Sequence, residues 1–156
     1  MKIELWTIGE TKEKYLKEGI AIFVKRLKHY TQFKTEDYKV KVHKSADGNG
    51  FKEVEGQYIM KKLQPSDFLV LLDERGKVYS SREFAGFIEK RQVASTQRII
   101  FLIGGAYGFH TSIYSRANAQ LSLSKMTFSH QMIRLFFVEQ LYRAYTIMNN
   151  EPYHND

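Results

Sequence analysis

The sequence contains no cysteine, and it has only two prolines and one tryptophan among its 156 residues. The absence of cysteine excludes disulfides, thiolate chemistry and cysteine-based zinc sites. The five histidines are scattered and show none of the spacings that zinc sites use. We therefore expect no structural metal.

Long apolar runs and acidic residues are also scarce. No stretch reaches eighteen consecutive apolar residues, and the N-terminus begins with a strand pattern instead of a signal sequence, so we expect a cytoplasmic protein. Only 17 acidic residues oppose 24 basic ones, which gives a net charge of +7. This balance favours a polyanionic partner, with nucleic acid as the leading candidate, although a merely soluble basic protein fits it too.

The chain predicts a single domain over residues 1–156. Its hydrophobic content of 43% suffices for one core, and no linker, repeat or low-complexity tract divides it. Periodicity predicts strands at residues 2–8, 33–42, 68–72, 98–103 and 120–123. It predicts helices at 11–30, 51–63, 80–91, 111–117 and 128–149.

The order of these elements predicts the fold class. Residues 68–72 form a continuous apolar run and residues 98–103 the next buried strand, which is typical of central parallel strands covered on both faces. Strands that alternate with helices indicate an α/β fold, a mostly parallel sheet with helices on both faces. In detail, we expect Thr11 to cap the first helix, residues 45–50 to form a turn, and residues 73–77 to end the third strand.

The predicted C-terminal helix, residues 128–149, would be about 33 Å long and is apolar nearly all round. Such a helix must be buried on more than one side, so we expect a homodimer with this helix in its interface. A central core helix in a monomer is the alternative. Arg134 and Glu139 could form a buried pair within it, whereas Arg143 and His154 lie where the helix runs out into a tail.

Ligands of open α/β sheets bind beyond the carboxyl ends of the strands. Three segments meet this description: Leu72 with Asp73, Gly104 with Gly105, and residues 121–128. A glycine pair lets a ligand approach the main chain, but taken alone it is more typical of a plain turn. The chain has neither GxGxxG nor a P-loop, so a dinucleotide site lacks its fingerprint.

Three motifs carry a family resemblance. They are Leu-Ile-Gly-Gly-Ala-Tyr-Gly-Phe at 102–109, Leu-Ser-Leu-Ser-Lys-Met-Thr-Phe-Ser-His-Gln-Met-Ile-Arg at 121–134, and Glu-Gln-Leu-Tyr-Arg-Ala-Tyr followed by Asn-Glu-Pro-Tyr-His over 139–154. These residues closely resemble the RlmH family of SPOUT-class methyltransferases, which act on N3 of a pseudouridine in 23S ribosomal RNA. The resemblance extends over nearly the whole chain.

The resemblance implies a C-terminal trefoil knot, a homodimer, and S-adenosyl-L-methionine bound in the knot. It implies an enzyme that modifies 23S rRNA within the ribosome or large subunit. The residues implied for cofactor binding are Leu72, Gly104, Gly105, Leu123, Ser124, Lys125, Met126, Thr127 and Phe128. Small residues and exposed main-chain groups at these positions suit an adenine edge.

The chemistry of this reaction suggests roles for residues of the tail. An imide nitrogen becomes a good nucleophile only as it loses its proton, so the site must accept a proton and stabilise negative charge. Arg143 suits charge stabilisation, His154 is the best titrating candidate for the proton, and Tyr153 is a candidate for positioning the base.

Two other function classes stay open from the residues alone. One is a non-catalytic ribosome-binding or assembly factor, in which the basic faces bind RNA and the cofactor site is vestigial. The other is a nucleotide-binding oxidoreductase, which the missing GxGxxG and the missing ribose-binding acid argue against. Binding of S-adenosylmethionine to the purified protein separates the first of these from an enzyme.

Overall fold

The computed structural model describes all 156 residues, and strands alternate with helices along the whole chain. The strands are β1 (Lys2–Ile8), β2 (Gln32–Tyr38), β3 (Phe68–Val78), β4 (Arg98–Ile103) and β5 (Ala119–Ser122). The helices are α1 (Lys14–Leu27), α2 (Gly48–Lys62), α3 (Ser81–Val93), α4 (Thr111–Arg116) and α5 (Met132–Met148). Each predicted element is present, and the strands at 2–8 and 98–103 have the predicted bounds.

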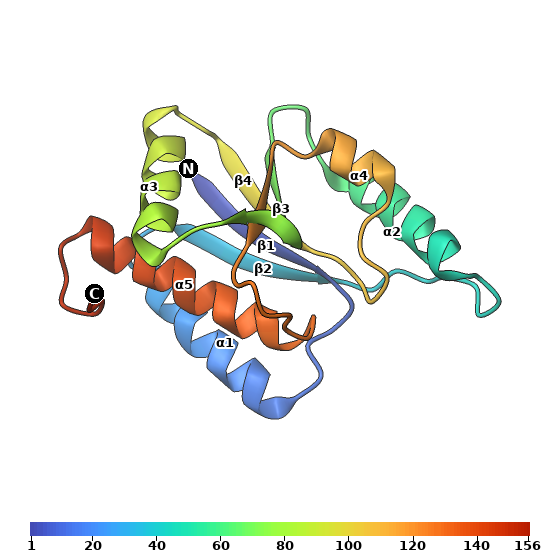
Figure 1. Cartoon of the computed structure of the whole chain (residues 1–156), viewed down its shortest axis with the longest axis horizontal. Coiled ribbons are helices and arrows are strands. Elements are labelled where there is room, and N and C mark those ends of the chain that lie inside the picture. The colour runs from blue at the N-terminus through green and yellow to red at the C-terminus, as the bar shows by residue number, and fades with distance from the viewer.

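The five strands form one sheet in the order β2-β1-β4-β3-β5, and every neighbouring pair is parallel. Figure 1 shows the sheet running through the centre of the molecule, with the helices on its two sides. The predicted α/β class, a parallel sheet with helices on both faces, is therefore confirmed. Because the strands are parallel, their carboxyl ends all lie at the same edge.

Two apolar clusters fill the two faces of the sheet. The larger one joins the sheet to α1, α3 and α5, and the smaller one joins it to α2 and α4. In β4, Phe101 belongs to the larger cluster and Leu102 to the smaller one, as the alternation of side chains along a strand requires. This alternation explains why residues 99–103 of the central strand β4 are all apolar.

Helix α5 lies on the larger cluster, between α1 and α3 (Figure 1). It has 17 residues and is about 25 Å long, shorter than predicted, because residues 128–131 form a loop before it. The predicted pair of Arg134 with Glu139 is wrong. The guanidinium of Arg134 instead donates to the carbonyl oxygens of Ile8, Gly9 and His130, and so ties the start of α5 to the end of β1.

Two predicted local details at helix starts are also wrong. Thr11 does not cap α1, because the helix begins later, with Glu13 at the N-cap. The Thr11 hydroxyl accepts a hydrogen bond from Arg134 instead. Residues 45–50 are not all turn, because Asp47 accepts a hydrogen bond from the amide of Gly50 and starts α2 at Gly48. A side-chain cap at Asp47 thus overrides the two weak helix formers that follow it.

Residues 73–77 do not end β3, which continues to Val78. The strand is irregular there, and Leu121 of β5 pairs with Leu72 before the irregularity and with Lys77 after it. Gly76 lies against the β5 main chain so closely that a Cβ atom there would be 2.6 Å from the amide nitrogen of Leu121. This close crossing holds β5 beside the end of the buried part of β3.

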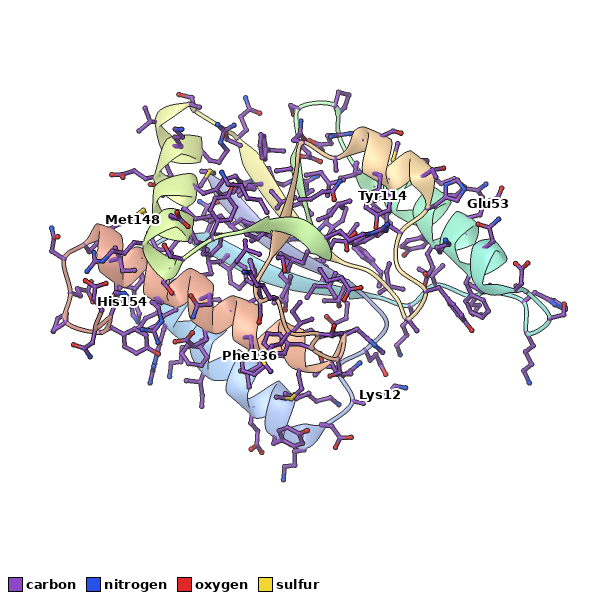
Figure 2. All side chains as sticks on the ribbon, viewed as in Figure 1. Lys12, Glu53, Tyr114, Phe136, Met148 and His154 are labelled. Atoms are coloured by element: carbon purple, nitrogen blue, oxygen red, sulfur yellow. The ribbon has the colours of Figure 1, made fainter.

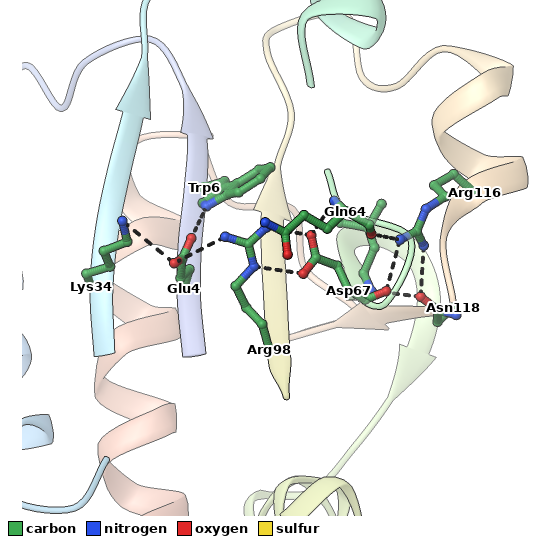
Figure 3. A network of polar contacts seen from close by, with 9 residues as sticks. Glu4, Trp6, Lys34, Gln64, Asp67, Arg98, Arg116 and Asn118 are labelled. Carbon is green, nitrogen blue, oxygen red and sulfur yellow. Dashed lines mark hydrogen bonds and ion pairs between the residues drawn. The ribbon is translucent and has the colours of Figure 1, made fainter. Parts of the chain in front are cut away.

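A network of polar contacts joins neighbouring strands of the sheet (Figure 3). Arg98 of β4 lies between two carboxylates, with Nη2 2.6 Å from Asp67 and Nη1 3.6 Å from Glu4 of β1. Glu4 also accepts a hydrogen bond from the indole of Trp6. The network links the first halves of three strands.

No helix of the structure is both long and apolar enough to span a membrane.

Candidate functional site

A cavity of about 480 Å³ lies beyond the carboxyl ends of β3, β4 and β5. This volume lies within the range of small-molecule sites, which is about 300–1,000 Å³. Its walls come from residues 72–75, at the end of the buried part of β3, from residues 103–109 at the end of β4 and beyond it, and from residues 121–124 and 126–130 between the end of β5 and the start of α5. Tyr114 of α4 and Ile133 of α5 complete the lining.

The structure brings together almost all of the residues that the sequence assigned to a cofactor. Those that line this cavity are Leu72, Gly104, Gly105, Leu123, Ser124, Met126, Thr127 and Phe128. Lys125 is the exception, since it lies in the same loop but is exposed and does not line the cavity. Met126 is 76% exposed, so this loop forms an accessible apolar rim of the cavity.

The two glycines of the β4 loop are explained partly by neighbours in the fold. A Cβ atom at Gly104 would lie 2.9 Å from the Phe109 ring, and one at Gly105 would lie 2.7 Å from the Glu55 carboxylate. Glu55 belongs to α2 and does not line the cavity. Burial raises the pKa of Glu55 above its ordinary value. The glycine pair therefore lets the loop pack closely on its far side as well as exposing main chain to the cavity.

The mouth of the cavity contains Asp73, which the sequence placed at a strand end where a ligand could bind, and also Glu74 and Arg75, which the sequence did not assign to the site. The Tyr114 hydroxyl donates to the carboxylate of Asp73, and Nη2 of Arg75 donates to that hydroxyl at 2.9 Å. Burial and the hydrogen bond to Asp73 raise the pKa of Tyr114. Glu74 accepts a hydrogen bond from Thr127 across the cavity at 3.0 Å. Only the position of residues 73–75 at the end of a buried strand hinted at this role.

The three predicted catalytic residues form a second cluster, at the C-terminal end of α5. Nη1 of Arg143 is 3.2 Å from Nδ1 of His154, and its guanidinium lies over the Tyr153 ring, 4.7 Å from the centroid. Glu139, which the sequence suggested as a partner of Arg134, accepts hydrogen bonds from Arg143 at 2.6 Å and from the Tyr153 hydroxyl at 2.9 Å. Its spacing of four residues before Arg143 is the signal that identifies the pair.

The hydrogen bonds of His154 define its tautomer. A guanidinium only donates, so Nδ1 of His154 accepts from Arg143, and the proton is on Nε2, 3.1 Å from a carboxylate oxygen of Asp156. Asp156 is itself held by two hydrogen bonds from Arg82 of α3, at 2.7 and 2.8 Å. The tail is thus fastened to α3 and α5. The lone pair of His154 is occupied by Arg143 in this arrangement.

The cavity and the tail cluster do not meet within one chain. Ile133 lines the cavity at the start of α5, whereas Arg143 lies ten residues further along the helix, a rise of about 15 Å. No residue of the tail lines the cavity. Figure 2 shows the same separation, with Tyr114 at the cavity and His154 at the opposite side of the molecule.

These features define a class of protein. Its members are α/β proteins with one parallel sheet and a small-molecule cavity at the ends of three neighbouring strands, without a dinucleotide-binding fingerprint. A family model described as "Predicted SPOUT methyltransferase" matches residues 1–154. The chain belongs to this SPOUT methyltransferase family.

Similar curated proteins extend over the whole chain. A protein of Christiangramia forsetii is 52% identical and one of Cytophaga hutchinsonii 48% identical, each over 99% of this chain and at least 99% of its own length. A protein of Parabacteroides distasonis is 49% identical over the full length of both chains. All three are named ribosomal RNA large subunit methyltransferase H.

A solved structure shows the same fold at low sequence identity. It is a probable methylase family protein from Haemophilus influenzae, 15% identical, with a TM-score of 0.52. The match covers 99% of this chain and 70% of that protein. It supports the fold alone.

Proposed function

We propose that this protein is an S-adenosylmethionine-dependent methyltransferase that modifies N3 of a pseudouridine in 23S rRNA on the assembled ribosome in the cytoplasm. The observation that carries the proposal is the cavity, which gathers the segments after β3, β4 and β5 that the family resemblance assigns to the cofactor. The names of the full-length relatives support an rRNA substrate. The net charge of +7 favours the same partner.

The lining of the cavity fits the proposed cofactor. Leu72, Leu123 and Phe128 supply apolar surface for an adenine, and Gly104 and Gly105 leave main-chain groups accessible. When bound, S-adenosylmethionine supplies a methyl group on a positively charged sulfonium. Asp73 and Glu74 place two carboxylates in the lining, which suits a ligand with an added positive charge.

Residues of the tail would bind and activate the target base. Arg143 suits the stabilisation of negative charge that spreads onto the carbonyl oxygens of the base. His154 can accept a proton only after its Nδ1 separates from Arg143, so we propose that the entering base displaces that contact. Tyr153, held by Glu139, would then position the base.

We also propose a homodimer in which α5 lies in the interface. Methyl transfer requires reacting atoms within about 3–3.5 Å, but the tail and the cavity lie at opposite ends of α5 in one chain. A second copy, placed antiparallel along α5, would bring its tail to this cavity. Phe136 of α5 and Ile22 of α1 are 38% and 52% exposed and suit such an interface. We infer that the close crossing of β3 and β5 belongs to the trefoil knot that the resemblance implies.

The test is methyl transfer from labelled S-adenosylmethionine to ribosomes of a strain that lacks this enzyme. We expect incorporation into 23S rRNA by the wild-type protein, and a loss of about 100-fold or more in Arg143→Ala and His154→Ala with unchanged cofactor affinity in calorimetry. A matched control is Lys90→Ala, an exposed residue of α3 without an ion pair. Near wild-type rates in both tail variants would contradict the catalytic assignment.

The same experiment separates the enzyme from a non-catalytic ribosome-binding factor. A protein that binds ribosomes but neither S-adenosylmethionine nor a labelled methyl group would be such a factor. Mapping the labelled nucleotide then tests the pseudouridine position. Sedimentation as a monomer at micromolar concentration would contradict the homodimer.

A further inference from the structure

Tyr107 is an exposed aromatic residue on the rim of the candidate cofactor cavity. It lies in the loop after β4, directly beyond Gly104 and Gly105, and it lines the cavity. The residue is nevertheless 56% exposed, and its hydroxyl makes no hydrogen bond within the protein. Its ring therefore projects from the mouth of the cavity without a polar partner of its own.

The position of this ring is fixed from behind by α2. The rings of Tyr107 and Phe51 lie 5.2 Å apart with an interplanar angle of 35°. The Tyr107 ring also contacts the main chain at Gly48, where a Cβ atom would lie 2.8 Å from Cδ1 of the ring. A hydrogen bond from the amide of Gly108 to the carbonyl of Gly105 closes the loop at 3.1 Å. The Tyr107 ring is thus held in a fixed position at one side of the cavity, with the Phe51 ring behind it.

The segment that supports these rings is basic. Residues 40–52 contain Lys41, Lys44 and Lys52, and Asp47 is their only acidic residue. None of these lysines forms an ion pair, whereas Lys39 just before them is paired with Glu10 at 2.6 Å. Asp47 is used as the cap of α2. Positive charge without a protein partner therefore lies in the segment that contains the half-buried Phe51 and supports the exposed Tyr107 ring.

Resting on the proposed function, we infer that Tyr107, supported by Phe51, is a stacking surface for a nucleotide next to the target base, with Lys44 and Lys52 contacting the adjacent RNA phosphates. A base that enters the cavity must leave its stack, and its neighbour thereby loses a stacking partner. An aromatic side chain restores that contact for any base. The exposed Lys44 and the half-buried Lys52 can neutralise the phosphates that come with it.

The experiment measures steady-state methyl transfer to ribosomes together with cofactor affinity by calorimetry. We expect Tyr107→Leu to raise KM for ribosomes about 5- to 100-fold, the range for loss of one stacked base, with a change in S-adenosylmethionine Kd below about threefold. Tyr107→Phe keeps the ring and should stay near the wild-type KM. An unchanged KM in Tyr107→Leu, or a loss confined to cofactor affinity, would overturn the inference and make Tyr107 a support of the cofactor loop.

The lysines are tested separately with the double variant Lys44→Ala/Lys52→Ala. We expect a higher KM for ribosomes and a weaker dependence of KM on salt concentration, because fewer counterions are released on binding. Lys90→Ala on α3 is the matched control and should change neither. Equal effects of the double variant and the control would show that RNA does not contact this segment. If the wild-type protein transfers no methyl group at all, the proposed function itself is wrong. If only the variants of this surface behave like wild type, the proposed function stands and the RNA-stacking inference is wrong.

Discussion

Asp67 is buried just before β3, where Arg98 binds its carboxylate and Arg116 donates to its main-chain carbonyl (Figure 3). It accepts hydrogen bonds from Nε and Nη2 of Arg98 at 2.8 and 2.6 Å and from the amide of Gln64 at 2.7 Å. Burial alone would raise the pKa of Asp67, but these hydrogen bonds outweigh it and hold the pKa below its ordinary value. The charged carboxylate is thus the form that the fold requires.

We expect Asp67→Asn to lower the free energy of unfolding at pH 7 by about 3 kcal/mol, because it leaves Arg98 without its closest counter-charge. The folded-state pKa lies below the unfolded one. The contribution of Asp67 is therefore complete above about pH 4 and is lost as the pH falls through the folded-state pKa. Urea unfolding at pH 7 and at successively lower pH measures the difference between wild type and variant.

The control is Glu18→Gln, which removes an exposed pair with Lys14 at 3.8 Å. Exposed pairs contribute little, so this variant should match the wild type at every pH. A gap between Asp67→Asn and wild type that stays constant down to pH 2 would contradict the assignment of the lowered pKa to this carboxylate.

At the scale of elements, the contact between β3 and β5 determines the shape of the cavity. Leu121 pairs with both Leu72 and Lys77, so the irregular segment of β3 passes directly over the β5 main chain. Gly76 makes that passage possible, because a Cβ atom there would lie 2.6–2.7 Å from main-chain atoms of β5. Main-chain atoms cannot move aside as the end of a flexible side chain can.

We expect Gly76→Ala to displace β5, to lower the unfolding free energy by more than about 2 kcal/mol and to weaken S-adenosylmethionine binding at least about tenfold. Gly86→Ala is the matched control, because Gly86 lies in α3 with nothing near its Cβ position, and alanine there should stabilise the protein by up to about 1 kcal/mol. Urea unfolding and calorimetry measure the two effects. Equal stability of both variants would refute the close packing at Gly76.

Patterns of apolar residues predicted the buried strands well, because β4 is apolar on both faces and its ends are charged or glycine. The extension of β3 to Val78 was not predictable, since Asp73, Glu74 and Gly76 all disfavour a strand locally. Tertiary pairing with β5 imposes that conformation. The early start of α2 was missed for a similar reason, because one side-chain cap outweighs two glycines.

The sequence predicted the loops that line the candidate cavity, but it did not predict the hydrogen bonds among the charged residues at the cavity mouth. Strand ends marked Leu72 and Gly104, but the hydrogen bond between Asp73 and Tyr114 joins residues 41 positions apart. No local pattern carries such a contact. The separation of the tail from the cavity also depends on the straight course of α5, which sequence spacing alone did not relate to either site.

At the scale of the molecule, α5 separates two incomplete parts of one proposed active site. Ile133 in its first turn lines the cavity, and Arg143 lies about 15 Å further along the axis, in contact with His154 of the tail. The tail is fastened in place by Arg82 and Glu139 of the same chain. A tail held there cannot reach the cavity of its own chain.

A mixed dimer tests whether the tail acts on the partner's cofactor. One copy carries Gly105→Trp, which places an indole in the loop that lines the cavity and should abolish cofactor binding, and the other carries His154→Ala. If the sites are shared between subunits, a heterodimer isolated with two different tags contains one intact site and should show about half of the wild-type rate. If each tail acts within its own chain, neither site is intact and the heterodimer should be as inactive as the two mutant homodimers. Thermal midpoints close to wild type for both variants are the required control, because an unfolded partner would leave no second site to complement. A heterodimer without activity, built from two folded subunits, would refute the shared site and require the tail to detach from Arg82 and bend back along α5.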